Sequence, residues 1–118
     1  MNSIEILERA AEIVMEGWSQ GDLAKGPNGE SVPPKSELAC QWCLVGSLVK
    51  AGNLAHVAEW NSLNFPTEMK EVVKAIRRET RTVSLVGWND APGRRQLDVV
   101  EMLHRAKWIE EMKLKWGE

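Results

Sequence analysis

The stretch ELACQWCLVGSLVKAG, residues 37–52, is largely apolar and contains both cysteines of this 118-residue chain. Ser36, directly before it, is a favourable helix N-cap, and Gly52 at its end is a favourable helix stop. On a helix between these two residues, apolar side chains would cover most of the circumference, which is typical of a helix buried on all sides. We therefore predict a central, buried helix over residues 36–52.

Outside this helix, the sequence predicts further helices and one loop region. Asn2 followed by Glu5 matches a capping box, so a first helix is expected over residues 3–16, with Gly17 ending it in the left-handed conformation. The turn dipeptide Asn28-Gly29 predicts a small hairpin or an ordered loop within residues 18–35. The remaining expected elements are a short helix from Asn53 through Trp60, a helix over residues 68–79 capped by Thr67, a short extended segment over residues 81–88, and a last helix over residues 95–116.

Size and composition indicate one mostly α domain, residues 1–118, with four to five helices around the central one. Its mass of 13.3 kDa is usual for a single domain. A formal net charge of -2 and a pI of about 5.8 disfavour nucleic acid as a partner. No apolar run reaches the roughly 20 residues that span a bilayer, and the charged N-terminus does not resemble a secretion signal. We therefore expect a cytoplasmic protein with no membrane partner and no cofactor.

The C-x-x-C pair, Cys40 and Cys43, is compatible with three chemical roles beside packing. A redox pair needs its reactive cysteine at a helix N-terminus, whereas the predicted helix places Cys40 past its first turn and Cys43 in its second turn. A zinc site would use Cys40, Cys43 and His56, with His104 as a fourth ligand. A cysteine-dependent hydrolase or transferase would use Cys43 as nucleophile, with His104 or His56 as base and Asn89 or Asp90 as orienting group. The apolar surroundings favour packing over all three roles.

The stretch GWNDAPGRR, residues 87–95, is the second candidate site. It contains an aromatic ring for stacking, amide and carboxylate edges, and two guanidinium groups at the start of a helix. Such a set suits a small anionic or nucleotide-like ligand, whereas the structural alternative is a capped loop packed on the core. We also expect Asn89 or Asp90 to accept a hydrogen bond from a tryptophan N–H. The candidate ligand-binding residues are Trp88, Asn89, Asp90, Arg94 and Arg95, with Trp42 and Trp18 clustered beside them.

Basic residues concentrate in the C-terminal half of the chain. On one common face they would permit contacts with an acidic partner surface or with phosphate groups, and the alternative is an ordinary solvated helix face. The residues are Lys70, Lys74, Arg77, Arg78, Arg81, Arg94, Arg95 and Arg105.

Three separated motifs resemble an uncharacterised family of small proteins in bacteria and their phages, which carries a domain-of-unknown-function label. The motifs are GWSQGDLAKGPNGESV, ACQWCLVGSLVKA and GWNDAPGRRQLDVVEMLHRA, within residues 3–106. The matching positions are Trp18, Gly21, Ala24, Gly29, Trp42, Cys43, Gly46, Leu48, Trp88, Asn89, Asp90, Pro92, Gly93 and Arg94. The resemblance implies no established activity.

The chain departs from the family pattern in three places. Arg95 stands where the pattern has threonine, a natural N-cap, so the last helix must be capped in another way. Cys40 lies outside the pattern, which further disfavours C-x-x-C chemistry. Residues 107–118 extend past the usual end and carry an apolar stripe that packs on a partner, on a second copy or on the chain's own core. The stripe consists of Trp108, Ile109, Met112 and Trp116.

Three functions follow as hypotheses. The leading one is a non-enzymatic binding module of phage or prophage type, which sequesters a small anionic or nucleotide-like ligand or inhibits a bacterial protein such as a defence protein. The second is the cysteine-dependent hydrolase or transferase. The third is a structural or assembly protein that forms a homodimer through its C-terminal helix.

Overall fold

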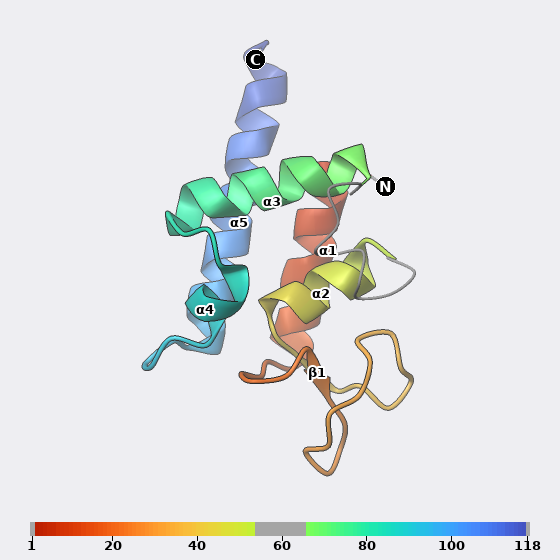
Figure 1. Cartoon of the computed structure of the whole chain (residues 1–118). Helices are drawn as coiled ribbons and strands as arrows, with labels where there is room; N and C mark the ends of the chain where they lie inside the picture. Colours follow the sequence, from red (N-terminus) through yellow and green to blue (C-terminus); the bar gives the residue numbers. More distant parts are fainter. Residues whose placement is uncertain (1, 54–65, 118) are drawn as a thin grey trace.

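The computed structural model describes residues 2–53 and 66–117, and the chain is mostly helical in these ranges (Figure 1). The expected fold class is confirmed for the described residues, which form five helices and one short pair of strands. The expected helix through Trp60 lies outside them. The elements are α1 (Ser3–Glu16), β1 (Ala24–Lys25), β2 (Gln41–Trp42), α2 (Leu44–Ala51), α3 (Thr67–Thr80), α4 (Leu85–Asn89) and α5 (Gln96–Lys115).

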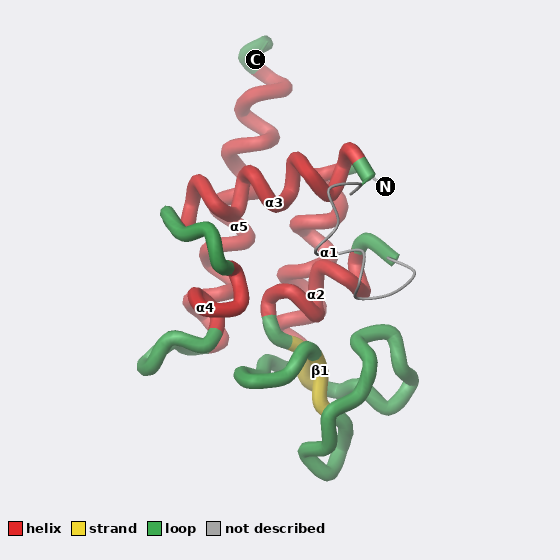
Figure 2. Tube along the Cα trace, in the orientation of Figure 1, coloured by secondary structure: helices red, strands yellow, loops and turns green. Residues whose placement is uncertain are grey.

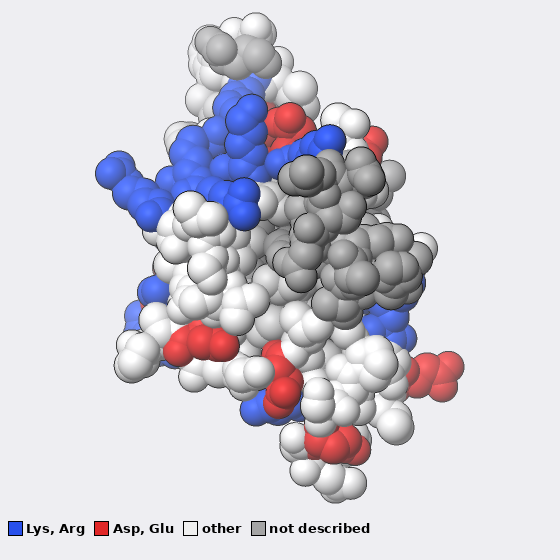
Figure 3. Space-filling view, viewed as in Figure 1, with Lys and Arg blue, Asp and Glu red and all other residues white. Residues whose placement is uncertain are grey.

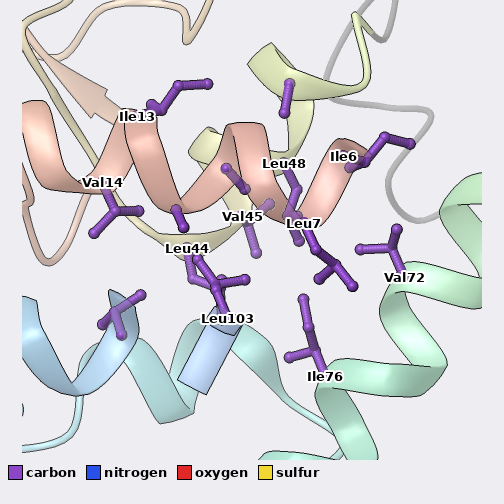
Figure 4. Close-up of a cluster of buried hydrophobic side chains, with 14 of the residues drawn as sticks. Ile6, Leu7, Ile13, Val14, Leu44, Val45, Leu48, Val72, Ile76 and Leu103 are labelled. Carbon is purple, nitrogen blue, oxygen red and sulfur yellow. The ribbon is translucent and has the colours of Figure 1, made fainter. Parts of the chain in front are cut away.

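The hydrophobic core lies between four of the helices. α1 packs against α5, α2 and α3, and Figure 4 shows apolar side chains of α1 and α2 meeting those of α3 and α5. Leu7, Leu48 and Ile76 have no exposed surface. Every residue of α2 except Lys50 is buried, so the prediction of a buried central helix is confirmed. The loops around β1 and β2 gather at the end of the molecule opposite the C-terminus (Figure 2).

The first helix begins as its sequence predicts. Asn2 Oδ1 accepts a hydrogen bond from Glu5 N at 2.9 Å, and Glu5 Oε1 accepts one from Asn2 N at 3.1 Å. At the other end, Gly17 follows α1 in an extended conformation with φ -176°, so the expected left-handed ending is wrong. Glycine is needed there for a close approach, because a Cβ atom would lie 2.1 Å from the carbonyl oxygen of Cys40.

The last two long helices match their predicted ranges within one residue. α3 begins at Thr67, and Pro66 rather than Thr67 occupies its N-cap position. α5 begins after Arg95, which has no acceptor to cap the helix. Instead, Asp98 Oδ2 accepts a hydrogen bond from Arg95 N at 2.9 Å. This contact is the half of a capping box in which the side chain of the third helical residue binds the backbone of the N-cap residue.

The central helix begins at Leu44, so the prediction that it starts after Ser36 is wrong. The backbone N–H groups just before α2 bond to other segments instead of forming a helical turn. Periodicity alone does not distinguish a short buried strand from a helix, which explains the error. Cys40 and Cys43 therefore do not share a helix face. The bonds run from Cys40 N to Lys25 O (2.9 Å), from Trp42 N to Gly17 O (3.0 Å) and from Cys43 N to Leu23 O (3.1 Å).

The predicted hairpin around Asn28-Gly29 is present. Lys25 and Ser31 form an antiparallel bridge, and Gly29 adopts φ 79° in the turn. On its other edge, β1 pairs antiparallel with β2, with Ala24 opposite Trp42. The hairpin is therefore attached to the segment that leads into α2.

Residues 81–88 were expected to be extended, but they contain the start of α4, and this prediction is wrong. Ser84 Oγ accepts a hydrogen bond from Gly87 N at 3.0 Å and so caps the helix. Leu85 and Asn89, one turn apart, are both buried. Capping and burial thus override the β propensity of residues 81–88.

Candidate functional site

A buried hydrogen-bond network centred on Asn89 joins three segments of the chain. The Asn89 side chain has no exposed surface. Its Oδ1 accepts hydrogen bonds from Trp18 Nε1 at 2.8 Å and from Leu44 N at 3.1 Å. Its Nδ2 donates to Ser19 O at 3.1 Å and to Asp90 Oδ1 at 2.9 Å. All four hydrogen-bonding positions of the amide are therefore used. The prediction that Asn89 or Asp90 bonds a tryptophan N–H is confirmed.

The arm that follows α1 is held against α4 by further bonds of this Asn89 network. Gln20 Nε2 donates to Asn89 O at 3.0 Å and to Ala91 O at 3.2 Å. Asp90 Oδ1 also accepts from Gly21 N at 3.1 Å. Gln20 was not predictable from the sequence, because a single glutamine in a loop gives no pattern that marks its partners.

Trp18 and Trp42, two of the candidate ligand-binding residues, also serve the fold. They face each other in a backbone bridge, and Ser19 N donates to Trp42 O at 3.2 Å. Trp42 is buried, and its Nε1 donates to Pro34 O at 2.9 Å. The polar atom of each indole ring therefore has a partner within the chain.

The other candidate residues of GWNDAPGRR are engaged in the same way. Arg94 stacks on Trp88, with its Cζ 3.9 Å from the ring centre, and its Nε donates to Trp88 O at 2.8 Å. Arg95 Nη2 pairs with Asp98 Oδ1 at 2.9 Å. Hydrogen bonds from Arg95 lower the pKa of the Asp98 carboxyl. The fold thus brings the stretch together, and the groups expected to bind a ligand are used by internal contacts.

Cys43 occupies the N-cap of α2, so the argument that placed it beyond the first helical turn is wrong. Its Sγ accepts a hydrogen bond from Gly46 N at 3.3 Å, and the residue is 4% exposed. Burial is the main cause that raises the pKa of the Cys43 thiol above its ordinary value of 9.0, although the N–H groups of the helix terminus oppose it. The thiol is therefore protonated at neutral pH, and its sulfur caps the helix.

The residues proposed to assist Cys43 lie in different settings. His104 is exposed on α5, Asp90 belongs to the Asn89 network, and His56 lies outside the described residues. Cys40 is exposed, with its Sγ 3.6 Å from Lys25 O. Within residues 2–53 and 66–117, no group of three or more histidine, cysteine or acidic residues is arranged to hold a metal ion.

The raised pKa of Cys43 predicts a loss of stability at alkaline pH. Below about pH 9 the thiol is protonated in both the folded and the unfolded state. Above pH 9 the unfolded state releases the proton first, so stability falls as the pH rises toward the folded pKa. In urea denaturation between pH 8 and pH 10, the wild type should lose stability that the variant Cys43→Ser does not lose. Equal pH dependence of the two proteins would contradict this assignment.

Three exposed basic side chains of α3 and the residue that follows the helix form a row, which we call the basic α3 face: Lys70, Lys74 and Arg77, with Arg81. The spacing of four and three residues places Lys70, Lys74 and Arg77 on one side of the helix, and Arg81 follows as its left-handed C-cap residue. Lys70, Lys74 and Arg77 line a shallow groove of about 260 Å³ together with Val73. Figure 3 shows lysine and arginine side chains gathered over α3 and the adjoining part of α5.

The other four basic residues considered from the sequence contact side chains outside the basic α3 face. Arg78 pairs with Glu110 at 2.9 Å, and Arg105 pairs with Glu79 at 3.2 Å. Arg94 and Arg95 belong to the loop before α5 and contact Trp88 and Asp98. The expected positive face is therefore smaller than the eight residues considered from the sequence.

Together these features define a small helical domain that is organised by a buried asparagine and displays a basic helix on its surface. The chain belongs to a family of unknown function, DUF6197, whose model matches residues 1–107. The match confirms the resemblance that the three motifs indicated, and it ends before Trp108. No curated protein and no solved structure matches the chain significantly. None of the helices in the described ranges combines the length and apolar character needed to cross a membrane.

Proposed function

We propose that the chain is a non-enzymatic binding module that recognises an acidic surface of a partner protein through the basic α3 face. The carrying observation is that three basic side chains on one side of α3, and Arg81 directly after the helix, lie exposed in a chain whose net charge is -2. Figure 3 shows acidic side chains mainly on the opposite half of the same view. This separation of charge creates a local positive potential that steers an acidic partner toward α3.

The shape of the basic α3 face supports a macromolecular partner. Its groove of about 260 Å³ is lined by residues of one helix, whereas small-molecule sites usually enclose about 300–1,000 Å³. An acidic protein surface meets the basic row without requiring a pocket.

The proposed partner is a bacterial protein that the module inhibits by covering its acidic surface. This follows the resemblance to proteins of bacteria and their phages. Inhibition by occlusion requires a rigid surface and no catalytic group. The buried, protonated Cys43 supports this function over the cysteine-dependent alternative.

Reversing two charges of the basic α3 face tests the proposal. The double variant Lys70→Glu/Lys74→Glu should capture at least about tenfold less of the partner from a bacterial lysate than the wild type does, because its charges then repel an acidic surface. Captured proteins are quantified by mass spectrometry at low and at moderate salt. Capture by the wild type should also decrease as salt rises.

A matched control changes the net charge equally at another surface. Arg9→Glu/Lys35→Glu alters two basic residues outside α3, and this variant should capture the partner like the wild type. Equal capture by the wild type and the α3 variant would overturn the proposal. Capture of nucleic acid in place of a protein, lost in the same variant, would also overturn it.

A further inference from the structure

The C-terminal part of α5 and the two residues after it, residues 107–117, expose large apolar side chains. Trp108 is 60% exposed and Trp116 is 68% exposed, while Met112 between them is half-buried. Because the three residues recur every four positions, they form one stripe along the helix, which we call the tail stripe. Figure 1 shows this end of α5 projecting past α3, away from the rest of the molecule. The tail stripe therefore does not pack on the core formed by the described residues.

We infer that the tail stripes of two copies of this chain pack antiparallel against each other. The spacing Trp-x-x-x-Met-x-x-x-Trp is the same when it is read from either end. Around a twofold axis at Met112, Trp108 of each copy faces Trp116 of the other, and the two Met112 side chains meet. A twofold interface requires a patch that is complementary to itself, and this spacing provides one.

The position of the protein body favours the antiparallel over the parallel orientation. The body of each protein lies at the N-terminal end of its tail, so a parallel pair would bring both bodies to the same end, where they would compete for space. Glu111 and Lys115 flank the stripe one turn apart. In an antiparallel pair, the flank that carries Glu111 and Lys115 faces the same flank of the second copy, so Glu111 comes within reach of its Lys115.

The exposed area indicates how strong the pairing is. A tryptophan has up to about 250 Å² to bury, so the two indole side chains of one tail expose roughly 300 Å² together. Two tails would bury roughly 600 Å² through these side chains, which is less than the roughly 1,200–2,000 Å² of a stable protein interface. We therefore expect a weak, reversible dimer.

Sedimentation equilibrium tests the pairing. The wild type should show a monomer–dimer equilibrium that shifts with concentration, and Trp108→Glu/Trp116→Glu should remain a monomer, because charged side chains replace the apolar contact. Val83→Glu provides the control, since Val83 is an exposed apolar residue outside the tail, and it should dimerise like the wild type. A wild type that stays monomeric at all concentrations, or a double tail variant that still dimerises, would overturn the inference.

Disulfide trapping tests the orientation. In a Cys40→Ser background, Met112→Cys should form a covalent dimer under copper–phenanthroline oxidation, because the two residues meet at the twofold axis. Trp108→Cys alone should not, whereas a mixture of Trp108→Cys and Trp116→Cys proteins should give a heterodimer. Efficient self-linking of Trp108→Cys would show a parallel pair and overturn the antiparallel arrangement.

Discussion

Replacing Asn89 with alanine is expected to lower the free energy of unfolding by about 4 kcal/mol, the sum of several lost buried hydrogen bonds. The substitution removes the acceptor of Trp18 Nε1 and of Leu44 N, and the donor to Ser19 O. Because Asn89 has no exposed surface, water does not replace these partners without opening the core. Urea denaturation followed by tryptophan fluorescence measures the loss.

Two companion variants show whether the loss comes from the network. Asn28→Ala removes an exposed turn asparagine and should change stability by less than about 1 kcal/mol. Trp18→Phe removes the indole N–H. Its effect should overlap with that of Asn89→Ala in a double-mutant cycle, since both substitutions remove the hydrogen bond from Trp18 Nε1 to Asn89 Oδ1. An Asn89→Ala protein within 1 kcal/mol of the wild type would contradict the role given to this network.

Replacing Gly46 with alanine is expected to destabilise the protein by about 3 kcal/mol or more through overpacking. A Cβ atom at Gly46 would lie 1.9 Å from the carbonyl oxygen of Leu23. That oxygen also accepts a hydrogen bond from Cys43 N at 3.1 Å, so moving it away breaks the contact between the hairpin and the start of α2. Thermal unfolding followed by circular dichroism should show a large decrease in Tm.

Gly87→Ala is the matched control for this substitution. Gly87 is also helical, but a Cβ atom there would meet the side-chain oxygen of Ser84 at 3.1 Å, with no backbone in the way. A shift of a few tenths of an ångström in the Ser84 side chain relieves this contact, and any weakening of its cap on Gly87 N should lower the Tm far less than the clash at Gly46 does. Equal Tm values for the Gly46 and Gly87 variants would show that the hairpin and α2 are not held in close contact.

Local signals predicted those elements that depend on neighbours in the sequence. The capping box of Asn2 and Glu5 and the turn at Asn28-Gly29 use partners within a few residues, so both were found. The start of α2 was missed because the partners of residues 40–43 come from residues 17–25. α4 was missed because its five residues depend on the Ser84 cap and on burial, which propensity does not reveal.

The sequence was sufficient to predict which residues form the candidate site, but it was not sufficient to predict what each of them does. The spacing of the motif identified Asn89, but an amide edge suits a ligand and a fold equally well. Its role depends on Trp18 and Leu44, which are 71 and 45 residues away in the sequence. Likewise, spacing placed Lys70 and Lys74 on one face, whereas the pairing of Arg78 with Glu110 depends on the packing of α3 against α5.

The scaffold and the binding surface are thus separate parts of the molecule. Asn89, Gly46 and Cys43 hold the segments together inside the domain, and the basic α3 face lies on its surface. Substitutions of the first group should lower stability, while charge changes on α3 should affect binding alone.

Lysine footprinting of the captured complex tests this claim most directly. The protein, free and bound to its captured partner, is acetylated briefly, and the modification of each lysine is read by mass spectrometry. We predict that Lys70 and Lys74 are protected in the complex, while Lys35, on the loop that leads to β2, reacts equally in both states. Protection of Lys35 with unchanged reactivity of Lys70 and Lys74 would show that the partner binds elsewhere and would contradict the account.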